Sequence, residues 1–375
     1  MTSLLPKVGI IFLTFPTSNG REDISRCLSS LEKLDYPREL VELICVESKG
    51  SREPIKPWFD QTWLTKSGTS LPRISYIFLE KEIGFSGNNN LGMEKARELG
   101  CELVYLLNED TDVDPLFLRT AVECMQSDEK IAIVQSLMLL GQARDRINSS
   151  GNAYHFLGFG YSNDYREQLT KSKEQSDALR SPLPAHEIGY ASGAAVLVRT
   201  SALNGGQLFD EKFFSYHEDT DISLRLRSQG WKIVVEPTSV IWHHYQFGKA
   251  KINYYWMERN RWALVLSYYK LWTLFLIAPI AFVMDIALSI FAIKNGWFDM
   301  KWKQLREWFD PSFWKWIRAR RQTIQSSRTI SDREFLRLAV ADIRFQEESV
   351  RNPVLEYIGN PLMRLYWGIV KLLIV

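Results

Sequence analysis

The chain has 375 residues, which is long enough for one large or two ordinary domains. Its 46 Lys and Arg residues almost balance its 44 Asp and Glu residues, so nothing in the global charge favours a nucleic-acid partner. The four cysteines show no CxxC spacing, which predicts reduced, mostly buried thiols in a cytosolic compartment. The segment before the first apolar run, at Val8, is too short for the core of a secretory signal, so we expect this end of the protein in the cytosol.

The first 140 residues alternate short apolar runs with longer mixed segments. Uninterrupted apolar runs are typical of strands buried on both faces of a sheet. Helices are expected from about Asp23 to Leu34 and from about Asn88 to Leu99, and strands are expected at Val8–Leu13, Val41–Val46, Ile74–Leu79, Leu103–Leu107 and Ile131–Leu139. The alternation predicts an α/β fold with a mainly parallel central sheet and helices on both faces.

Polar turns follow the ends of these strands, at Thr14–Ser18, Glu47–Ser51, Gly84–Asn90 and Asn108–Asp114. Ligands of open parallel sheets bind outside the carboxyl ends of the strands. Glycines allow the backbone to approach a ligand, and the next helix offers N–H groups to an anion. The GxGxxG spacing of dinucleotide-binding loops is absent. Taken alone, Gly84–Asn90 fits an Asn-rich turn with a helix cap better than it fits a nucleotide-binding loop. Its register with the other turns favours a nucleotide site.

The stretch Leu106–Pro115 ends a strand in a cluster of carboxylates. Carboxylates at such a place can hold a hard divalent cation, which in turn holds phosphate. The alternative is that Asp112 or Asp114 caps the helix after Pro115. This stretch alone favours neither interpretation.

These motifs together resemble the inverting glycosyltransferase family two, and within it the rhamnosyltransferase-like branch. That family shows a strand ending in Asp-Asn-Gly-Ser, a Gly-Phe-small-Gly-Asn-Asn-x-Gly turn, and Leu-Leu-Asn-Pro-Asp; here Glu47–Ser51, Gly84–Gly92 and Leu106–Asp110 match them. Glu47 replaces the aspartate that reads the base, and Glu109 replaces the proline. Asn108 stands where many relatives have the first aspartate of Asp-x-Asp.

The resemblance implies an A-type glycosyltransferase fold that binds a nucleotide-diphospho-sugar with a divalent cation, Mg²⁺ or Mn²⁺. Asp110 is then the main carboxylate on the metal, and we expect Asp112 and Asp114 to cap the helix. The donor contacts expected in the first half are Thr14, Pro16, Glu47, Gly84, Asn88, Asn90, Asn108 and Glu109.

Small residues at 189–195 precede a β-branched run, which predicts a tight bend leading into a strand. Ser192, Gly193, Ala194 and Arg199 match the family's Ser-Gly-Ala-x-x-x-x-Arg pattern. The resemblance implies that Ser192 and Gly193 lie under the donor sugar and acceptor. Small residues selected only for close packing are an equal alternative.

The most specific family motif is matched by Phe213-Phe214-Ser215-Tyr216-His217-Glu218-Asp219-Thr220-Asp221-Ile222. Without context, an aspartate here would simply cap the following helix, which Gly230 is expected to end. An inverting transfer needs a carboxylate to accept the proton of the attacking hydroxyl. We therefore expect Asp219 to be the base, Glu218 and His217 to contact the acceptor or sugar, and Asp221 to cap the helix.

Two histidines end a predicted strand at Val240–Trp242, and the resemblance implies that His243 completes the metal or diphosphate site. Imidazole suits manganese better than magnesium. Arg259 and Arg261 resemble a family segment near the diphosphate, where a guanidinium can pair two phosphate oxygens. The alternative is that both arginines form the polar face of a helix at a membrane.

Leu271–Ile293 contains one charged residue, Asp285, and is long enough to span a bilayer. Basic residues on both sides predict that both ends are cytosolic. We therefore expect a re-entrant or in-plane hairpin, at about 263–293, bent near Pro279. Amphipathic helices are expected over 297–375, and Met363–Val375 is expected to be a second membrane contact. An amphipathic helix pair packed on the catalytic domain is the alternative.

We expect residues 1–120 to form the nucleotide-sugar half and 121–255 the acceptor half of one catalytic domain, followed by a membrane-associated tail, 256–375. The sequence predicts an inverting hexosyl- or rhamnosyltransferase acting on a lipid-linked glycan at the cytosolic membrane face, in cell-surface polysaccharide or glycolipid synthesis. The alternatives are a sugar nucleotidyltransferase and a non-catalytic membrane scaffold. No nucleic-acid partner is expected, because the basic tail adjoins an apolar segment and lacks a base-stacking sheet.

Overall fold

The computed structural model describes residues 5–14, 20–49, 53–169, 184–244, 251–344 and 353–375. The chain forms two compact units whose segments alternate along the sequence. The first unit comprises Met1–Gly151, Ser162–Phe214 and Lys232–Gln246. The second comprises Asn152–Tyr161, Ser215–Trp231 and Phe247–Val375.

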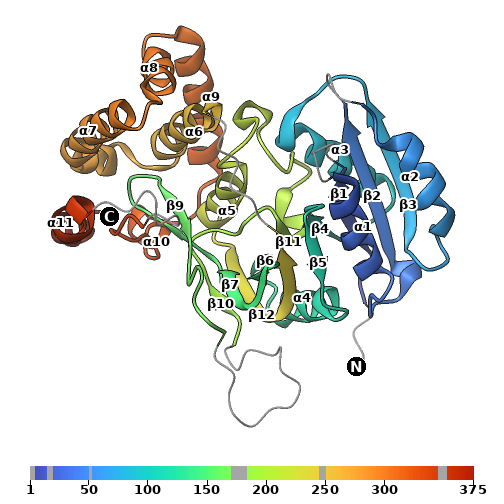
Figure 1. The fold of residues 1–375 in the computed structure, drawn as a ribbon. Coiled ribbons are helices and arrows are strands. Elements are labelled where there is room, and N and C mark those ends of the chain that lie inside the picture. Colours follow the sequence, from blue (N-terminus) through green and yellow to red (C-terminus); the bar gives the residue numbers. More distant parts are fainter. Residues whose placement is uncertain (1–4, 15–19, 50–52, 170–183, 245–250, 345–352) are drawn as a thin grey trace. The chain divides into compact units, whose positions relative to one another are not determined.

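A ten-stranded sheet forms the centre of the first unit (Figure 1). Its spatial order is β10-β12-β6-β11-β4-β1-β2-β3, with β5 paired to β12 and β7 paired to β6. The strands are β1 (Val8–Leu13), β2 (Val41–Ser48), β3 (Arg73–Leu79), β4 (Leu103–Leu107), β5 (Thr111–Val113), β6 (Ile131–Leu140), β7 (Ala143–Ser149), β10 (His186–Glu187), β11 (Ala195–Arg199) and β12 (Lys232–His243). β8 (Asn152–Tyr154) and β9 (Gly160–Ser162) pair separately.

The five predicted strands of the first 140 residues are confirmed. β4, β1, β2 and β3 pair in parallel, as apolar runs separated by helices predict. β11 lies antiparallel between β4 and β6, so the sheet becomes mixed beyond β4. Ala195, the first residue of β11, pairs with Leu107, the last residue of β4. The small residues that precede β11 therefore lie beside the acidic turn that follows β4.

Helices cover both faces of this sheet, as predicted. Ile10 and Phe12 share a core with α1, α2 and α4, whereas the alternate residue Ile11 faces α3. The helices are α1 (Gly20–Leu31), α2 (Lys56–Thr62), α3 (Gly84–Glu98) and α4 (Phe117–Ser127). The four cysteines, which lie on α1, β2, the segment before β4 and α4, are buried and free, as expected.

α3 begins at Gly84, four residues before the predicted start. The stretch interpreted as a ligand-binding turn therefore forms the first turns of a helix. Gly92 serves packing, because a Cβ atom there would lie 2.6 Å from Cγ2 of Ile11. The small residue lets α3 approach β1 closely.

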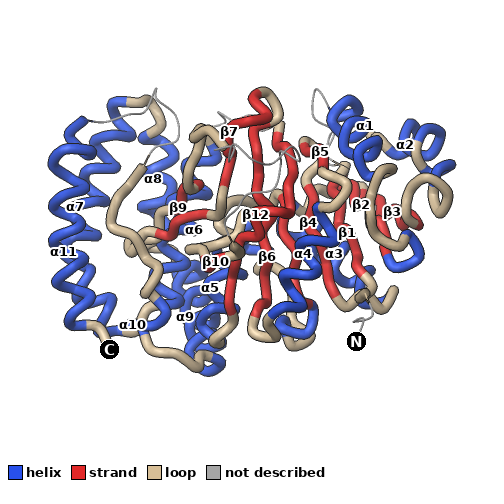
Figure 2. The backbone as a smooth tube through the Cα atoms, turned by 90° about the horizontal axis from the view of Figure 1, so that it is seen from below, coloured by secondary structure: helices blue, strands red, loops and turns tan. Residues whose placement is uncertain are grey.

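The second unit is mainly helical (Figure 2). Its helices are α5 (Glu218–Ser228), α6 (Ile252–Tyr268), α7 (Leu271–Lys294), α8 (Phe298–Glu307), α9 (Pro311–Ser327), α10 (Asp332–Phe335) and α11 (Asn360–Leu373). Gly230 follows α5 with a φ of 87°, which fits its predicted role in ending the helix. The predicted bend near Pro279 is wrong, because α7 continues through that residue. A proline removes only one donor, and the neighbouring turns keep the helix intact.

Candidate functional site

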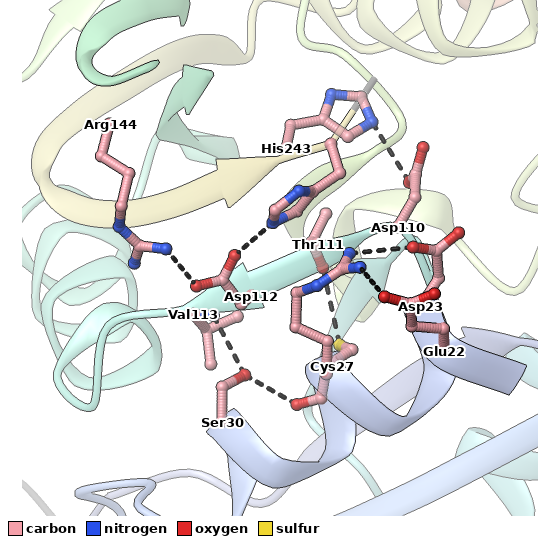
Figure 3. A network of polar contacts seen from close by, with 12 residues as sticks. Glu22, Asp23, Cys27, Ser30, Asp110, Thr111, Asp112, Val113, Arg144 and His243 are labelled. Carbon is pink, nitrogen blue, oxygen red and sulfur yellow. Dashed lines mark hydrogen bonds and ion pairs between the residues drawn. The ribbon is translucent and has the colours of Figure 1, made fainter. Parts of the chain in front are cut away.

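Asp110 and His243 lie together in the first unit. The antiparallel pairing of β5 and β12 places Thr111 opposite His243. Asp110 directly precedes Thr111 and therefore lies next to His243. Oδ1 of Asp110 lies 3.2 Å from Nε2 of His243. That oxygen is buried and accepts no hydrogen bond from the described residues. Figure 3 shows this pair within the polar network around β5.

The second ring nitrogen of His243 faces Asn148, which is on β7. Nδ1 of His243 lies 3.0 Å from Oδ1 of Asn148, and the amide is 6% exposed. A carbonyl oxygen can only accept, so Nδ1 carries a proton and the ring is held with Nε2 facing Asp110. A metal-binding histidine is commonly oriented by such a bond. Asn148 was missed in the sequence because nothing local distinguishes it.

The Asp110 carboxylate is ionised in this environment. Burial alone raises its pKa, but the neighbouring His243 and His244 outweigh burial and hold the pKa below the ordinary value. Burial and the nearby charge of Asp110 raise the pKa of Glu109 to about 8. Glu109 therefore differs from Asp110 in protonation at neutral pH, although the two are adjacent.

Asp112 does not cap α4, contrary to our expectation. It lies in β5, where Oδ1 is 2.8 Å from Nε2 of His244 and Oδ2 is 2.9 Å from Nη1 of Arg144. The Arg144 guanidinium stacks 3.8 Å from the centre of the Trp242 ring. Asp114 is not the cap of α4 either, because Leu116 holds that position and α4 has no side-chain cap. The carboxylate of Asp114 accepts the N–H of Leu116 at 2.9 Å, in the turn before the helix.

The strip of small residues before β11 adjoins the acidic turn. The N–H of Asn108 donates to the carbonyl of Ala194 at 2.9 Å. The N–H of Ser192 donates to Oε1 of Gln135 at 2.8 Å. The bond from Asn108 to Ala194 therefore links the acidic turn to the strip that contains Ser192 and Gly193.

Glu47 has a structural role that the sequence did not predict. It is completely buried, and its carboxylate accepts hydrogen bonds from the N–H of Ile55 at 2.6 Å and the hydroxyl of Tyr76 at 2.8 Å. The Tyr76 hydroxyl also lies 3.1 Å from Oγ1 of Thr14, itself buried. We therefore do not retain Glu47 as a base-reading residue. Pro16 lies outside the described residues.

Two of the three expected donor contacts on α3 serve packing. Gly84 has a φ of 74°, and a Cβ atom there would lie 2.7 Å from the Phe214 ring. Nδ2 of Asn90 donates to the carbonyl of Phe209 at 2.9 Å. Asn88 donates to Oγ of Ser48 at 2.8 Å, whereas its buried Oδ1 has no partner among the described residues. Asn88 thus remains a candidate for the donor.

The two expected catalytic carboxyl groups occupy the first turn of α5, in the second unit. Burial and the charge of Asp219 raise the pKa of Glu218 to about 8, and Oε2 of Glu218 is buried without a hydrogen-bond partner among the described residues. Oδ1 of Asp219 instead accepts the N–H of Thr220 at 2.6 Å. This bond and the helix N-terminus stabilise an ionised carboxylate. The two adjacent carboxyl groups therefore lie in different surroundings, with Glu218 buried and Asp219 bound to a backbone N–H.

The loop before α5 is strained. Tyr216 and His217 both have a φ of 67°, a conformation that L residues adopt rarely. Nδ2 of Asn260 donates to the carbonyls of Ser215 at 3.1 Å and Tyr216 at 2.8 Å. Burial and Arg261 lower the pKa of His217 to about 4, so its ring is neutral. Asn260 was missed because we considered only its arginine neighbours.

Asp221 is not the helix cap that we expected. It lies one turn inside α5, 2% exposed, where it accepts a hydrogen bond from the hydroxyl of Tyr268 at 2.7 Å and pairs with Arg320. The position before α5 belongs to His217, which makes no side-chain cap. Asp221 therefore ties α5 to α6 and α9.

Arg261 is committed to partners inside the second unit. It is 2% exposed, and Nε and Nη2 each donate to the Glu258 carboxylate at 3.0 Å, while Nη1 donates to the carbonyl of Leu157 at 3.0 Å. This arrangement contradicts the expected diphosphate contact. The guanidinium of Arg259 stacks 4.6 Å from the Trp316 ring. Its expected role with the donor stays a prediction.

In the part of the chain that the structure describes, no three His, Cys, Asp or Glu side chains gather closely enough to hold a metal by themselves. Asp110 and His243 supply two potential ligands. The buried, unsatisfied oxygen of Asp110 facing an imidazole nitrogen fits a cation whose other ligands are substrate phosphates and water.

Comparison with known families identifies the family of this chain. A family model described as glycosyl transferase family group 2 matches residues 103–318, which is more than half of the chain. The chain belongs to this family. It is therefore a glycosyltransferase, as the acidic turn and the Glu218–Asp219 motif predict.

Individual relatives are more distant from this family-two glycosyltransferase. It is 42% identical over 57 residues to an N-acetylglucosaminyl-diphospho-decaprenol L-rhamnosyltransferase of Mycobacterium tuberculosis, a match that covers 15% of this chain and 19% of that protein. The structure of GalNAc-T7 with UDP, GalNAc and Mn²⁺ aligns with a TM-score of 0.55 and 14% identity, covering 74% of this chain and 51% of that one. S. aureus TarS 1–349 with UDP-GlcNAc aligns with a TM-score of 0.47 and 15% identity, covering 97% and 90%. The GalNAc-T7 alignment confirms the A-type fold.

Proposed function

We propose that this glycosyltransferase moves a sugar from a nucleotide-diphospho-sugar to an acceptor hydroxyl with inversion at the anomeric carbon. The observation that carries the proposal is the 3.2 Å approach of Asp110 Oδ1 to His243 Nε2 next to the end of β4. Donor diphosphates bind at the carboxyl ends of strands in open α/β sheets. Asn88, Asn108 and the Ser192–Gly193 strip, all in the first unit, are proposed to contact the donor or its sugar.

A divalent cation, Mg²⁺ or Mn²⁺, is proposed to bind to Asp110 and His243. When bound, it supplies positive charge that stabilises the departing nucleoside diphosphate. The mixed carboxylate and imidazole set favours manganese. The presence of Mn²⁺ in the GalNAc-T7 structure supports a cation of this kind.

Asp219 is proposed as the general base. Its carboxylate takes the proton of the acceptor hydroxyl while the hydroxyl oxygen bonds to the anomeric carbon and the bond from that carbon to the diphosphate breaks. The ionised state of Asp219, which its bond to the Thr220 N–H favours, suits this role. Glu218 tends to keep its own proton and is proposed to donate a hydrogen bond to the acceptor or sugar.

The proposed acceptor is a lipid-linked glycan at the cytosolic face of the membrane, in polysaccharide or glycolipid synthesis. The name of the mycobacterial relative includes a decaprenol-linked substrate, which supports this class. Among the described residues, α7 is the one helix long and apolar enough to cross a membrane, and only 11% of its most apolar window is buried. Apolar surface of this extent is unusual on a protein that meets only water.

The test is mass spectrometry of the purified chain with a panel of nucleotide-sugars, with and without MnCl₂, and with a polyprenyl-diphosphate-linked acceptor. Sugar transfer with release of nucleoside diphosphate supports the proposal. Release of diphosphate from sugar phosphate and a nucleoside triphosphate would instead identify a nucleotidyltransferase. The absence of both transfer and donor hydrolysis would indicate a scaffold and contradict the proposal.

A further inference from the structure

One side of α7 is an extended apolar surface. Exposed side chains repeat along it with helical spacing and cover about half of its circumference. They include Leu271, Trp272, Phe275, Phe282, Val283, Ile286, Ile290 and Ile293, and Phe282 is 69% exposed. The opposite side, with Thr273, Ile277, Ala281 and Ala292, is buried against the second unit.

α11 extends this surface. The hydroxyl of Tyr366 donates to the carbonyl of Leu276 at 2.6 Å, and Nε1 of Trp272 donates to the carbonyl of Leu373 at 3.1 Å. The two helices therefore lie side by side and antiparallel (Figure 2). The outer side of α11 carries Leu362, Leu365, Ile369 and Leu372, all exposed. We call the exposed apolar side chains of α7 and α11 the apolar face.

The charges on these two helices are complementary to anionic headgroups. Lys294 and Lys371 are exposed, and neither helix has an acidic residue except Asp285. Arg364 is exposed as well, and its Nε lies 3.1 Å from Oδ1 of Asp342. Two copies of this apolar face would bring like charges together, which disfavours a dimer through it. Basic side chains beside exposed aliphatic and aromatic ones are typical of helices lying at an anionic lipid surface.

Asp285 is bound from inside the protein. Nζ of Lys301 lies 2.6 Å from Oδ1 of Asp285, 2.9 Å from Oε2 of Glu258 and 2.9 Å from Oε1 of Gln304. Lys301 is completely buried, and its helix, α8, also carries Lys303, Arg306 and Glu307. If α7 spanned a bilayer, α8 would have to enter the hydrocarbon with these charges. The ion pair therefore ties α7 to α8 and keeps the Asp285 carboxylate on the side of α7 that faces the protein.

We infer that α7 and α11 form an in-plane docking surface for an anionic bilayer, with the apolar face inserted at headgroup depth and neither helix crossing. The inference deepens the proposed membrane partner and rests on the proposed function only for the lipid-linked acceptor. In this arrangement the apolar face of α7 and α11 contacts the membrane. The Lys301–Asp285 pair lies on the side of α7 that faces the protein.

A depth measurement distinguishes in-plane from spanning geometry. The native cysteines are buried, so cysteines placed at Phe275 and Ile290 can take a nitroxide selectively. These positions are 15 residues apart, or about 22 Å along the helix axis. On phosphatidylglycerol–phosphatidylcholine vesicles we expect both nitroxides, and a third at Leu365, within about 5–10 Å of the headgroups. A depth difference approaching the full axial separation would overturn the inference in favour of a span.

Vesicle sedimentation tests whether an anionic bilayer is the partner of the apolar face. We expect Phe282→Glu with Ile286→Glu to weaken partitioning to the anionic vesicles at least tenfold. Leu64→Glu, at an exposed apolar position in the first unit, should leave it unchanged, and pure phosphatidylcholine should bind more weakly. No partitioning by the wild-type chain, or a dimer abolished by the double variant, would overturn the inference. Donor hydrolysis in water, assayed on the same samples, reports separately on the proposed function.

Discussion

Nε2 of His243 and Oδ1 of Asp110 face each other at 3.2 Å, although 133 positions separate the two residues in the chain. The arrangement has two physical interpretations. It is either half of a cation site or an ion pair between a protonated imidazole and a carboxylate. The two make different predictions for metal binding.

Replacing Asp110 with alanine should abolish metal-dependent donor binding. The site would lose its only ionised ligand, since Glu109 tends to stay protonated near neutral pH. Mn²⁺ binding, followed by electron paramagnetic resonance, and donor affinity, followed by calorimetry, check this expectation. Asp114→Asn is the matched control, because an asparagine oxygen can still accept the Leu116 N–H. Unchanged Mn²⁺ affinity in Asp110→Ala would favour the simple ion pair.

Asn148→Ala should weaken Mn²⁺ binding by about 10- to 100-fold, because the ring of His243 would lose the partner that sets its tautomer and direction. Asn148→Asp keeps an acceptor at the same place and should restore most of the affinity. A purely structural role for Asn148 would lower thermal stability in both variants without this difference in metal affinity.

Asp219→Asn should reduce transfer by about 10²–10⁴-fold while donor affinity stays within a few-fold of wild type. The amide cannot accept the acceptor proton, but it retains an oxygen for the Thr220 N–H. Single-turnover transfer and donor calorimetry are the measurements. Loss of donor binding in this variant would remove Asp219 from the role of base.

The raised pKa of Glu218 predicts a pH dependence of folding. Between pH 4.5 and about 8 the native state keeps a proton that the unfolded state has lost, so the free energy of unfolding should fall as pH rises through this window. In Glu218→Gln this loss should be absent. On going from pH 4.5 to pH 8.5, the variant should therefore lose less free energy of unfolding than wild type, by on the order of 1–3 kcal/mol. Urea unfolding at the two pH values checks it, with exposed Glu98→Gln as control. Equal pH profiles in wild type and Glu218→Gln would contradict the raised pKa.

Lys301→Met should lower the free energy of unfolding by about 3–5 kcal/mol, because the buried carboxylates of Glu258 and Asp285 would lose a shared partner. Lys303→Met, at an exposed position on the same helix, should change it by less than about 1 kcal/mol. Urea unfolding of both variants gives the comparison. Equal effects would mean that the buried cluster contributes no more than surface charge does.

The sequence alone determined the five strands of the first 140 residues and the place of the acidic turn, whereas β5, β7 and β10 were not predicted. Val8–Leu13 and Leu103–Leu107 are apolar without interruption, and a strand buried on both faces requires this pattern whatever its neighbours are. The turn after β4 was predictable because a change from apolar to acidic residues ends a buried strand. The resemblance to the family selected both Asp110 and His243, but only the structure showed that their side chains approach to 3.2 Å.

Only the tertiary structure decided what each polar side chain contacts. Glu47 and Arg261 looked like ligand contacts by type and motif, yet their partners, Tyr76 and Glu258 among them, are internal. Asn148 reaches His243 across 95 positions through the pairing of β7 and β12 with β6, and Asp285 is neutralised by a lysine of another helix. Local patterns encode periodicity and turns, whereas such contacts depend on strand register and helix packing. The same amino acid can therefore bind a substrate or stabilise the fold, and its burial and partners decide between them.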